Sequence, residues 1–171
     1  MPTLVDVLAP EAVALHVHVA SKRQLLHDLA DAASDLVGAE PRAVLNALHE
    51  RERLGSTGVG QGVALPHARV GGVEKLAGLF WQLDEAVPFD AIDDVPVDLV
   101  FVLIVPEHGD VDHLKALARI ARRLRDPDIR ARLRTAGDRA EAWHLLTDTA
   151  APARSGEGPH QGATGHAAGA A

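Results

Sequence analysis

The chain has 171 residues, enough for one domain, and its hydrophobic fraction of 47% permits a sizeable core. It has no cysteine, which excludes disulfides, thiolate chemistry and cysteine-based zinc sites. The net charge of −7 and the aromatic fraction of 3% argue against nucleic acid as a partner, because phosphate contacts need cations and base stacking needs aromatic rings.

No apolar run approaches the roughly 18 residues that a membrane-spanning helix needs. The first residues also lack the basic segment and the apolar segment of a signal peptide. We therefore expect a cytoplasmic protein that is not inserted in a membrane. Residues 150–171 are rich in alanine and glycine and contain no large apolar side chain, which predicts a disordered tail. The folded domain should then span residues 1–149.

The N-terminal third predicts one strand and two helices. Alternating apolar and polar side chains over residues 14–19 predict a short strand. Ser21 and Gln24 have the spacing of a capping box, so a helix should run from there to Gly38. A second helix should span residues 41–53, with a proline at its first position. The side chains expected to face the core are Leu25, Leu29, Ala32 and Leu36 in the first helix, and Val44, Leu45 and Leu48 in the second.

The middle of the chain predicts a sheet. A short strand should follow the glycine-rich segment at residues 63–67, and longer strands should span residues 76–83 and 97–105. The last of these is almost entirely apolar, as expected for a central strand that is covered on both faces.

Helices are predicted for the C-terminal part of the domain, at residues 113–125, 127–135 and 138–148. Asp112 is expected to cap the first of them. The side chains of that helix expected to face the core are Leu114, Leu117, Ala121 and Leu124. Strands that alternate with helices predict a layered α/β domain.

Residues 55–62 contain four glycines in eight positions, just ahead of His67. No lysine follows them as a Walker A loop requires, and a helix precedes them where a dinucleotide fingerprint needs a strand. The segment is either a plain flexible connection or a nest of backbone N–H groups for an anion that His67 carries or receives. The candidate phosphate-binding residues are Ser56, Thr57, Gly58, Gly60 and Gly62.

A second polar stretch follows the central strand. It places His108, Asp110, Asp112 and His113 at a strand exit, where ligands collect in α/β sheets. These side chains could bind a metal for hydrolysis, or they could be a helix cap and loop polarity. We favour the cap for Asp112 and loop polarity for Asp110. His113 should lie in the first helical turn, where free N–H groups favour an anion, so it is a candidate for a second phosphate contact.

The segment "RERLGSTGVGQGVALPH" resembles the active-site signature of the mannitol/fructose-type enzyme IIA components of the bacterial phosphotransferase system. "VPFDAIDDVPVDLVFVLIVP" and "DHLKALARIARRLRDPDIRARL" are also similar to that family, most of all to its nitrogen-regulatory branch. The resemblance covers residues 3–148. It implies that His67 accepts the phosphoryl group, that Arg51 assists, and that His113 is the second active-site histidine. It also implies one domain with a mixed sheet between helices.

The resemblance further implies a phosphohistidine carrier protein of the HPr or NPr kind as donor, and regulatory protein targets. No metal and no cofactor are needed, because the donor is already a phosphohistidine. Two alternatives remain open. The chain could be the IIA component of a fructose or mannitol transport system that passes phosphate to a IIB domain, or a metal-dependent hydrolase that uses residues 108–113. Residues 112–139 are rich in arginine and could steer an acidic partner or form a solvated helix face.

Overall fold

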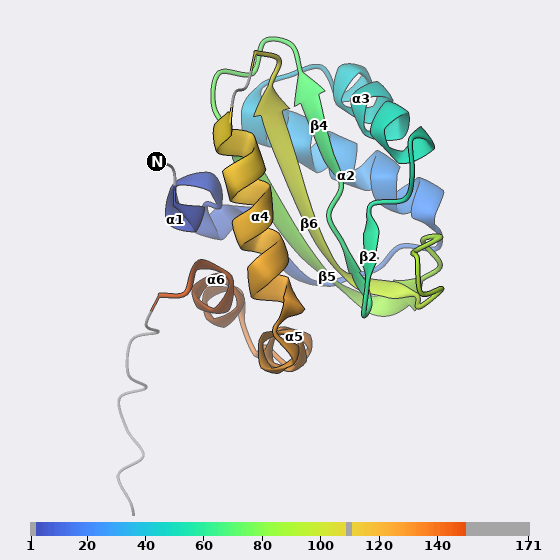
Figure 1. The fold of residues 1–171 in the computed structure, drawn as a ribbon, viewed down its shortest axis with the longest axis vertical. Coiled ribbons are helices and arrows are strands. Elements are labelled where there is room, and N and C mark those ends of the chain that lie inside the picture. The colour runs from blue at the N-terminus through green and yellow to red at the C-terminus, as the bar shows by residue number, and fades with distance from the viewer. Residues whose placement is uncertain (1–2, 109–110, 150–171) are drawn as a thin grey trace, which may run out of the picture.

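The computed structural model describes residues 3–108 and 111–149 (Figure 1). Its helices are α1 (Leu4–Val7), α2 (Lys22–Val37), α3 (Pro41–Arg53), α4 (Val111–Arg125), α5 (Pro127–Arg134) and α6 (Arg139–Thr147), with a 3-10 helix, η1, at Pro10–Ala12. Its strands are β1 (Val13–Val17), β2 (Gly58–Gly60), β3 (Val63–Ala64), β4 (His67–Val70), β5 (Ala77–Val87) and β6 (Val97–Pro106). None of the helices in these two ranges is long and apolar enough to cross a membrane.

The centre of the sheet is β6. The strand order is β1-β5-β6-β3-β2, and β4 also pairs with β6. β6 runs antiparallel to β5 and parallel to β3 and β4, so the sheet is mixed. From Val97 to Val105 every side chain of β6 except Asp98 is buried, which confirms the central strand predicted for residues 97–105.

β3 and β4 lie one after the other along the same edge of β6. Ala64 pairs with Val100 and His67 pairs with Leu103, so the strand predicted for residues 63–67 is split in two. The break contains Pro66, which has no N–H for a sheet ladder but whose carbonyl accepts from the Leu103 N–H at 3.0 Å. The register along β6 is kept, and His67 becomes the first residue of β4.

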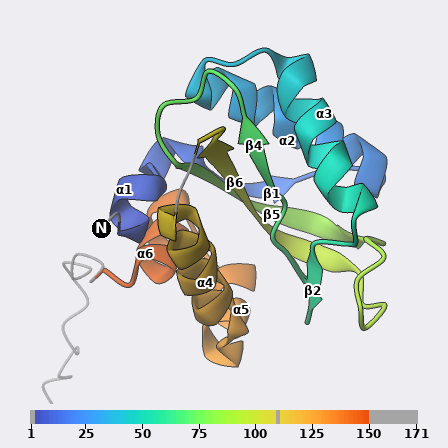
Figure 2. The ribbon, with the colours of Figure 1, turned by 45° about the horizontal axis from the view of Figure 1, so that its top comes forward.

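Helices cover both faces of the sheet (Figure 2). On one face α2 and α3 pack together, and they contact β5 and β4. On the other face α4 and α5 contact β6, and α6 contacts β1. This arrangement confirms the single domain with a mixed sheet between helices. Among the described strands β4 pairs with β6 alone, so helices from both faces can reach its outer edge.

α2 begins and ends close to the predicted positions. The Ser21 side chain accepts from the Gln24 N–H, as expected for an N-cap. The Gln24 side chain accepts from Ala20 N rather than from Ser21 N, so the capping box is not complete. Gly38 follows the helix at φ 70°, in the left-handed region.

The buried face of α2 differs from the prediction. Leu25 and Leu29 are fully buried as expected, but Leu36 is 40% exposed. α2 packs against both α3 and β5, so its buried stripe is two residues wide. The stripe consists of Leu25, Leu26, Leu29, Ala30, Ala33 and Ser34.

Two predictions for α4 are wrong. The helix begins at Val111, so Asp112 lies inside the first turn and does not precede it as a cap. Leu114 is 57% exposed, because the buried stripe of α4 is set by other positions that lie one turn apart. These positions are Ala116, Ile120 and Leu124.

Candidate functional site

His67 is held with one ring nitrogen free to act as a nucleophile. The half-buried ring places its Nδ1 2.9 Å from the carbonyl oxygen of Leu65. A carbonyl can only accept, so Nδ1 carries a proton, and in the neutral ring Nε2 then keeps its lone pair. The Leu65 carbonyl is itself fixed, because the Leu65 N–H donates to the Thr57 carbonyl at 2.9 Å.

Arg51 faces that lone pair from the last turn of α3. Its Nε donates to His67 Nε2 at 3.2 Å, and its Nη1 donates to the Gly55 carbonyl at 2.8 Å. A guanidinium has no acceptor, so this contact independently requires an unprotonated Nε2. The Gly55 contact holds the arginine against the chain that follows α3, and the position beside Nε2 therefore carries a fixed positive charge.

The surroundings of His67 also favour its neutral form. Burial lowers the pKa of His67 from its ordinary value of 6.5, more than the Leu65 contact raises it. The positive charges of Arg51 and His113 lower this pKa further, while Glu52 opposes them. Near neutral pH the ring is therefore an uncharged imidazole with a free Nε2.

His113 reaches the same region from the first turn of α4. Its Nε2 lies 3.2 Å from Nη2 of Arg69, which is two residues beyond His67 on β4 and so on the same side of that strand. Arg51 of α3 thus contacts His67 at the start of β4, and His113 of α4 contacts Arg69 on the same side of β4. Figure 1 shows the three elements α3, β4 and α4.

Residues 6–149 match the family model described as "Phosphoenolpyruvate-dependent sugar phosphotransferase system, EIIA 2". The chain belongs to this family. As an EIIA type 2 protein it is a component of a phosphotransfer system, and the match spans all the elements that build the site.

Relatives of this EIIA protein have two kinds of name. The chain is 48% identical over 143 residues to the "Nitrogen regulatory protein" of Bradyrhizobium diazoefficiens, covering 84% of this chain and 94% of that protein. It is 36% identical over 139 residues to the "PTS system fructose-specific EIIA component" of Haloferax volcanii, covering 81% of this chain and 90% of that protein. The crystal structure of nitrogen regulatory protein IIA-Ntr from Neisseria meningitidis superposes with a TM-score of 0.81 at 36% identity, covering 84% of this chain and 99% of that one.

The two hydroxyls proposed as phosphate donors are directed at the protein itself. Ser56 Oγ donates to the Phe89 carbonyl at 2.9 Å and accepts from the Gly58 N–H at 3.1 Å. Thr57 donates both its N–H and its hydroxyl to Glu52 Oε1. These contacts fix the backbone just after α3. The direct phosphate-binding role of Ser56 and Thr57 stays a prediction.

The glycines of this EIIA domain allow close packing. A Cβ at Gly58 would lie 2.7 Å from the Ala91 Cβ, and Gly62, at φ +80°, leaves no room for one beside Arg134. Gly58 and Gly60 form β2, within a segment that was predicted to be a loop. The contacts of Gly60 and Gly62 are with residues after β5, not with His67. Their role in binding phosphate, like that of Gly58, stays a prediction.

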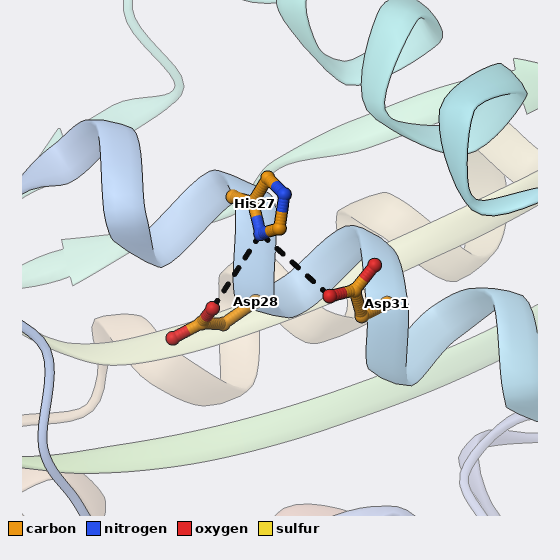
Figure 3. A group of neighbouring side chains, drawn as sticks. All are labelled: His27, Asp28 and Asp31. Atoms are coloured by element: carbon orange, nitrogen blue, oxygen red, sulfur yellow. Dashed lines mark ion pairs between the residues drawn. The ribbon is translucent and has the colours of Figure 1, made fainter.

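The metal alternative concerned residues 108–113, of which Asp110 lies outside the described residues. In the described part of the chain, the one group whose geometry could hold an ion is elsewhere, on α2 (Figure 3). There His27 Nδ1 lies 3.7 Å from Asp28 and 3.6 Å from Asp31, and all three side chains are solvent-accessible. Among the described residues no contact links this group to His67, and the group does not support the hydrolase alternative.

Three charged residues around the site were missed from the sequence. Arg69 could have been found, since strand alternation places it on the same side as His67. Glu52 anchors Thr57 and lies beside Arg51 in the chain. Lys22 pairs with Glu52 at 3.1 Å and donates to the Phe89 carbonyl at 3.0 Å, contacts that no local pattern indicates.

Proposed function

We propose that this EIIA protein is a phosphocarrier whose His67 Nε2 accepts a phosphoryl group from the phosphohistidine of a small carrier protein of the HPr or NPr kind. The observation that carries the proposal is the state of Nε2. It is unprotonated, it belongs to a half-buried ring, and it is flanked by the Arg51 guanidinium. The family match supports the phosphotransfer chemistry, and the regulatory relatives support a role in which the phosphorylation state controls target proteins.

The transfer balances without an external acid or base. The Nε2 lone pair of His67 forms a bond to phosphorus while the N–P bond to the carrier's histidine breaks. The electron pair of that bond returns to the carrier's imidazole. The proton on His67 Nδ1 remains hydrogen-bonded to Leu65 throughout. Because the donor already carries an activated phosphoryl group, the step needs no nucleotide.

Positive charge near Nε2 is what this step needs. Its transition state spreads negative charge over the equatorial oxygens, so catalysis is mostly positioning and electrostatic stabilisation. Arg51 now contacts Nε2 and would turn to the incoming phosphoryl group while keeping its Gly55 contact. His113 would donate from the other side, out of the first turn of α4.

The direct test is to map the phosphoryl group. The full chain would be incubated with enzyme I, the carrier protein and phosphoenolpyruvate, and the product examined by phosphorus and nitrogen NMR. We expect one acid-labile phosphoryl group, bonded to Nε2 of His67. Label on His113, label on Nδ1 of His67, or no label at all would contradict the proposal.

The same phosphorylated and unphosphorylated preparations separate regulation from transport. If the protein is regulatory, the two forms should bind different target proteins, because phosphorylation adds nearly two negative charges beside Arg51 and Arg69. If it serves sugar transport instead, the phosphoryl group should pass rapidly to a fructose- or mannitol-specific IIB domain. Rapid transfer to IIB together with equal target binding would replace the regulatory proposal with the transport one.

The lowered pKa of His67 predicts an acid-tolerant reaction. The nucleophile is the neutral ring, which is lost only as the pH falls through the pKa in the folded protein. That pKa lies below 6.5, chiefly because the ring is buried. The rate of phosphoryl acceptance should therefore hold from about pH 8 to about pH 6.5 and fall below that range. An NMR titration should place the midpoint of His67 below 6.5, and a midpoint above it would contradict the prediction.

A further inference from the structure

We propose that Arg69 is a positioning residue of this site, which holds His113 as the neutral tautomer with its proton on Nδ1. The inference deepens the proposed function and rests on it for its consequence in phosphoryl transfer. The contact itself and its effect on the His113 ring can be tested without any phosphoryl donor.

The strand register explains how Arg69 reaches His113. Arg69 pairs with Val105 of β6, one residue before that strand ends at Pro106. Its side chain extends to the connection between β6 and α4. Nη1 lies 3.3 Å from the carbonyl oxygen of Glu107, and Nη2 lies 3.2 Å from Nε2 of His113. One guanidinium therefore contacts the chain both before and after residues 109–110.

The position of the proton on the His113 ring follows from the contact with Nη2 of Arg69. Every N–H of a guanidinium donates, and none of its atoms accepts. The Nη2 contact consequently requires a lone pair on Nε2 of His113. In the neutral ring the remaining proton is then on Nδ1, which makes Nδ1 the donor nitrogen of the ring. The rigid planar fork of arginine suits this task, because it can donate to Glu107 and to His113 at the same time.

This assignment gives the two histidines matched tautomers for different tasks. In His67 the Leu65 carbonyl keeps the proton on Nδ1 and leaves Nε2 as a nucleophile. In His113 the Arg69 guanidinium keeps the proton on Nδ1 and leaves Nδ1 as a donor. Arg69 also adds positive charge near His113.

The first experiment measures the tautomer. Imidazole nitrogen shifts of the unphosphorylated full chain, recorded at about pH 8 where neutral histidine dominates, report which nitrogen carries the proton. We expect Nδ1–H for His113 in the wild type and in R69K, and a shift toward Nε2–H in R69A. His67 should remain Nδ1–H in all three. A wild-type His113 protonated on Nε2, or a tautomer unchanged in R69A, would overturn the proposal.

The second experiment measures transfer to His67. R69A should slow phosphoryl acceptance at least about tenfold, because a donor loses its orientation, and R69K should recover most of the rate. R125A is the matched control, since it removes an exposed arginine from the far end of α4. If R125A and R69A slow phosphoryl acceptance equally, the loss of net charge explains the effect, and the positioning role is overturned. No phosphorylation of wild-type His67 would instead overturn the proposed function and leave the tautomer result standing.

Discussion

Replacing Arg51 by alanine should slow phosphoryl acceptance by His67 about a hundredfold while leaving the domain folded. The substitution removes the cation whose Nε lies 3.2 Å from the reacting nitrogen. Losing one such preorganised donor typically raises the barrier by about 3 kcal/mol. The measurement is the single-turnover rate from a phosphorylated carrier protein, with the melting temperature as a check on folding.

Two variants separate geometry from charge. R51K keeps the charge but has only one donor nitrogen, so it cannot hold the Gly55 carbonyl while it reaches the phosphoryl group, and we expect an intermediate rate. R53A is the matched control, because Arg53 lies in the same helical turn and is exposed. In R51A the pKa of His67 should also rise, since the Arg51 charge is one of the causes that lower it. A rate within twofold of the wild type in R51A would refute the role assigned to Arg51.

The parts of the site predicted from the sequence are those with a local signature. Arg51 and His67 lie within one continuous motif, and His113 lies near the start of the helix that follows an apolar strand. The structure brings these three residues together because β4 lies against β6, which leads into α4. Arg69 and Lys22 have no such signature. Arg69 contacts His113, which is 44 residues away in the sequence, and Lys22 contacts Phe89, which is 67 residues away. Only the fold reveals these contacts.

The fold was predictable where periodicity is strong and not where glycine dominates. The nearly continuous apolar run at residues 97–105 predicted β6 as the central strand, because a strand that is covered on both faces needs no alternation of apolar and polar side chains. β2 was missed, because Gly58 and Gly60 give no side-chain pattern. Its glycines are explained by contacts formed only in the folded chain, such as the approach of Ala91 to Gly58. Leu36 and Leu114 were misplaced because helical periodicity alone does not say how wide the buried stripe is or where it is centred.

Replacing Lys22 by methionine should lower the free energy of unfolding by about 3 kcal/mol and the melting temperature on the order of 10 °C. The Glu52 side chain is only 6% exposed, and its Oε2 has no hydrogen-bond partner among the described residues. The charge of Oε2 is balanced by the Lys22 ammonium 3.1 Å away, an ion pair without hydrogen-bond alignment. Methionine fills similar space but leaves Glu52 buried without a counter-charge. The check is chemical denaturation of K22M beside K75M, which removes an exposed lysine.

The ion pair can be isolated with a double-mutant cycle. E52Q removes the buried charge but keeps an oxygen that can accept from Thr57, so it should destabilise less than K22M. The double variant should then lose less free energy of unfolding than the two single variants lose together, by at least about 1 kcal/mol. Lys22 also lies over the Phe89 ring and donates to its carbonyl, which Ser56 contacts too. K22M should therefore loosen residues 54–58 next to the nucleophile, and hydrogen exchange there should rise. Additive losses with unchanged exchange would show that Lys22 does not hold this part of the site through Glu52.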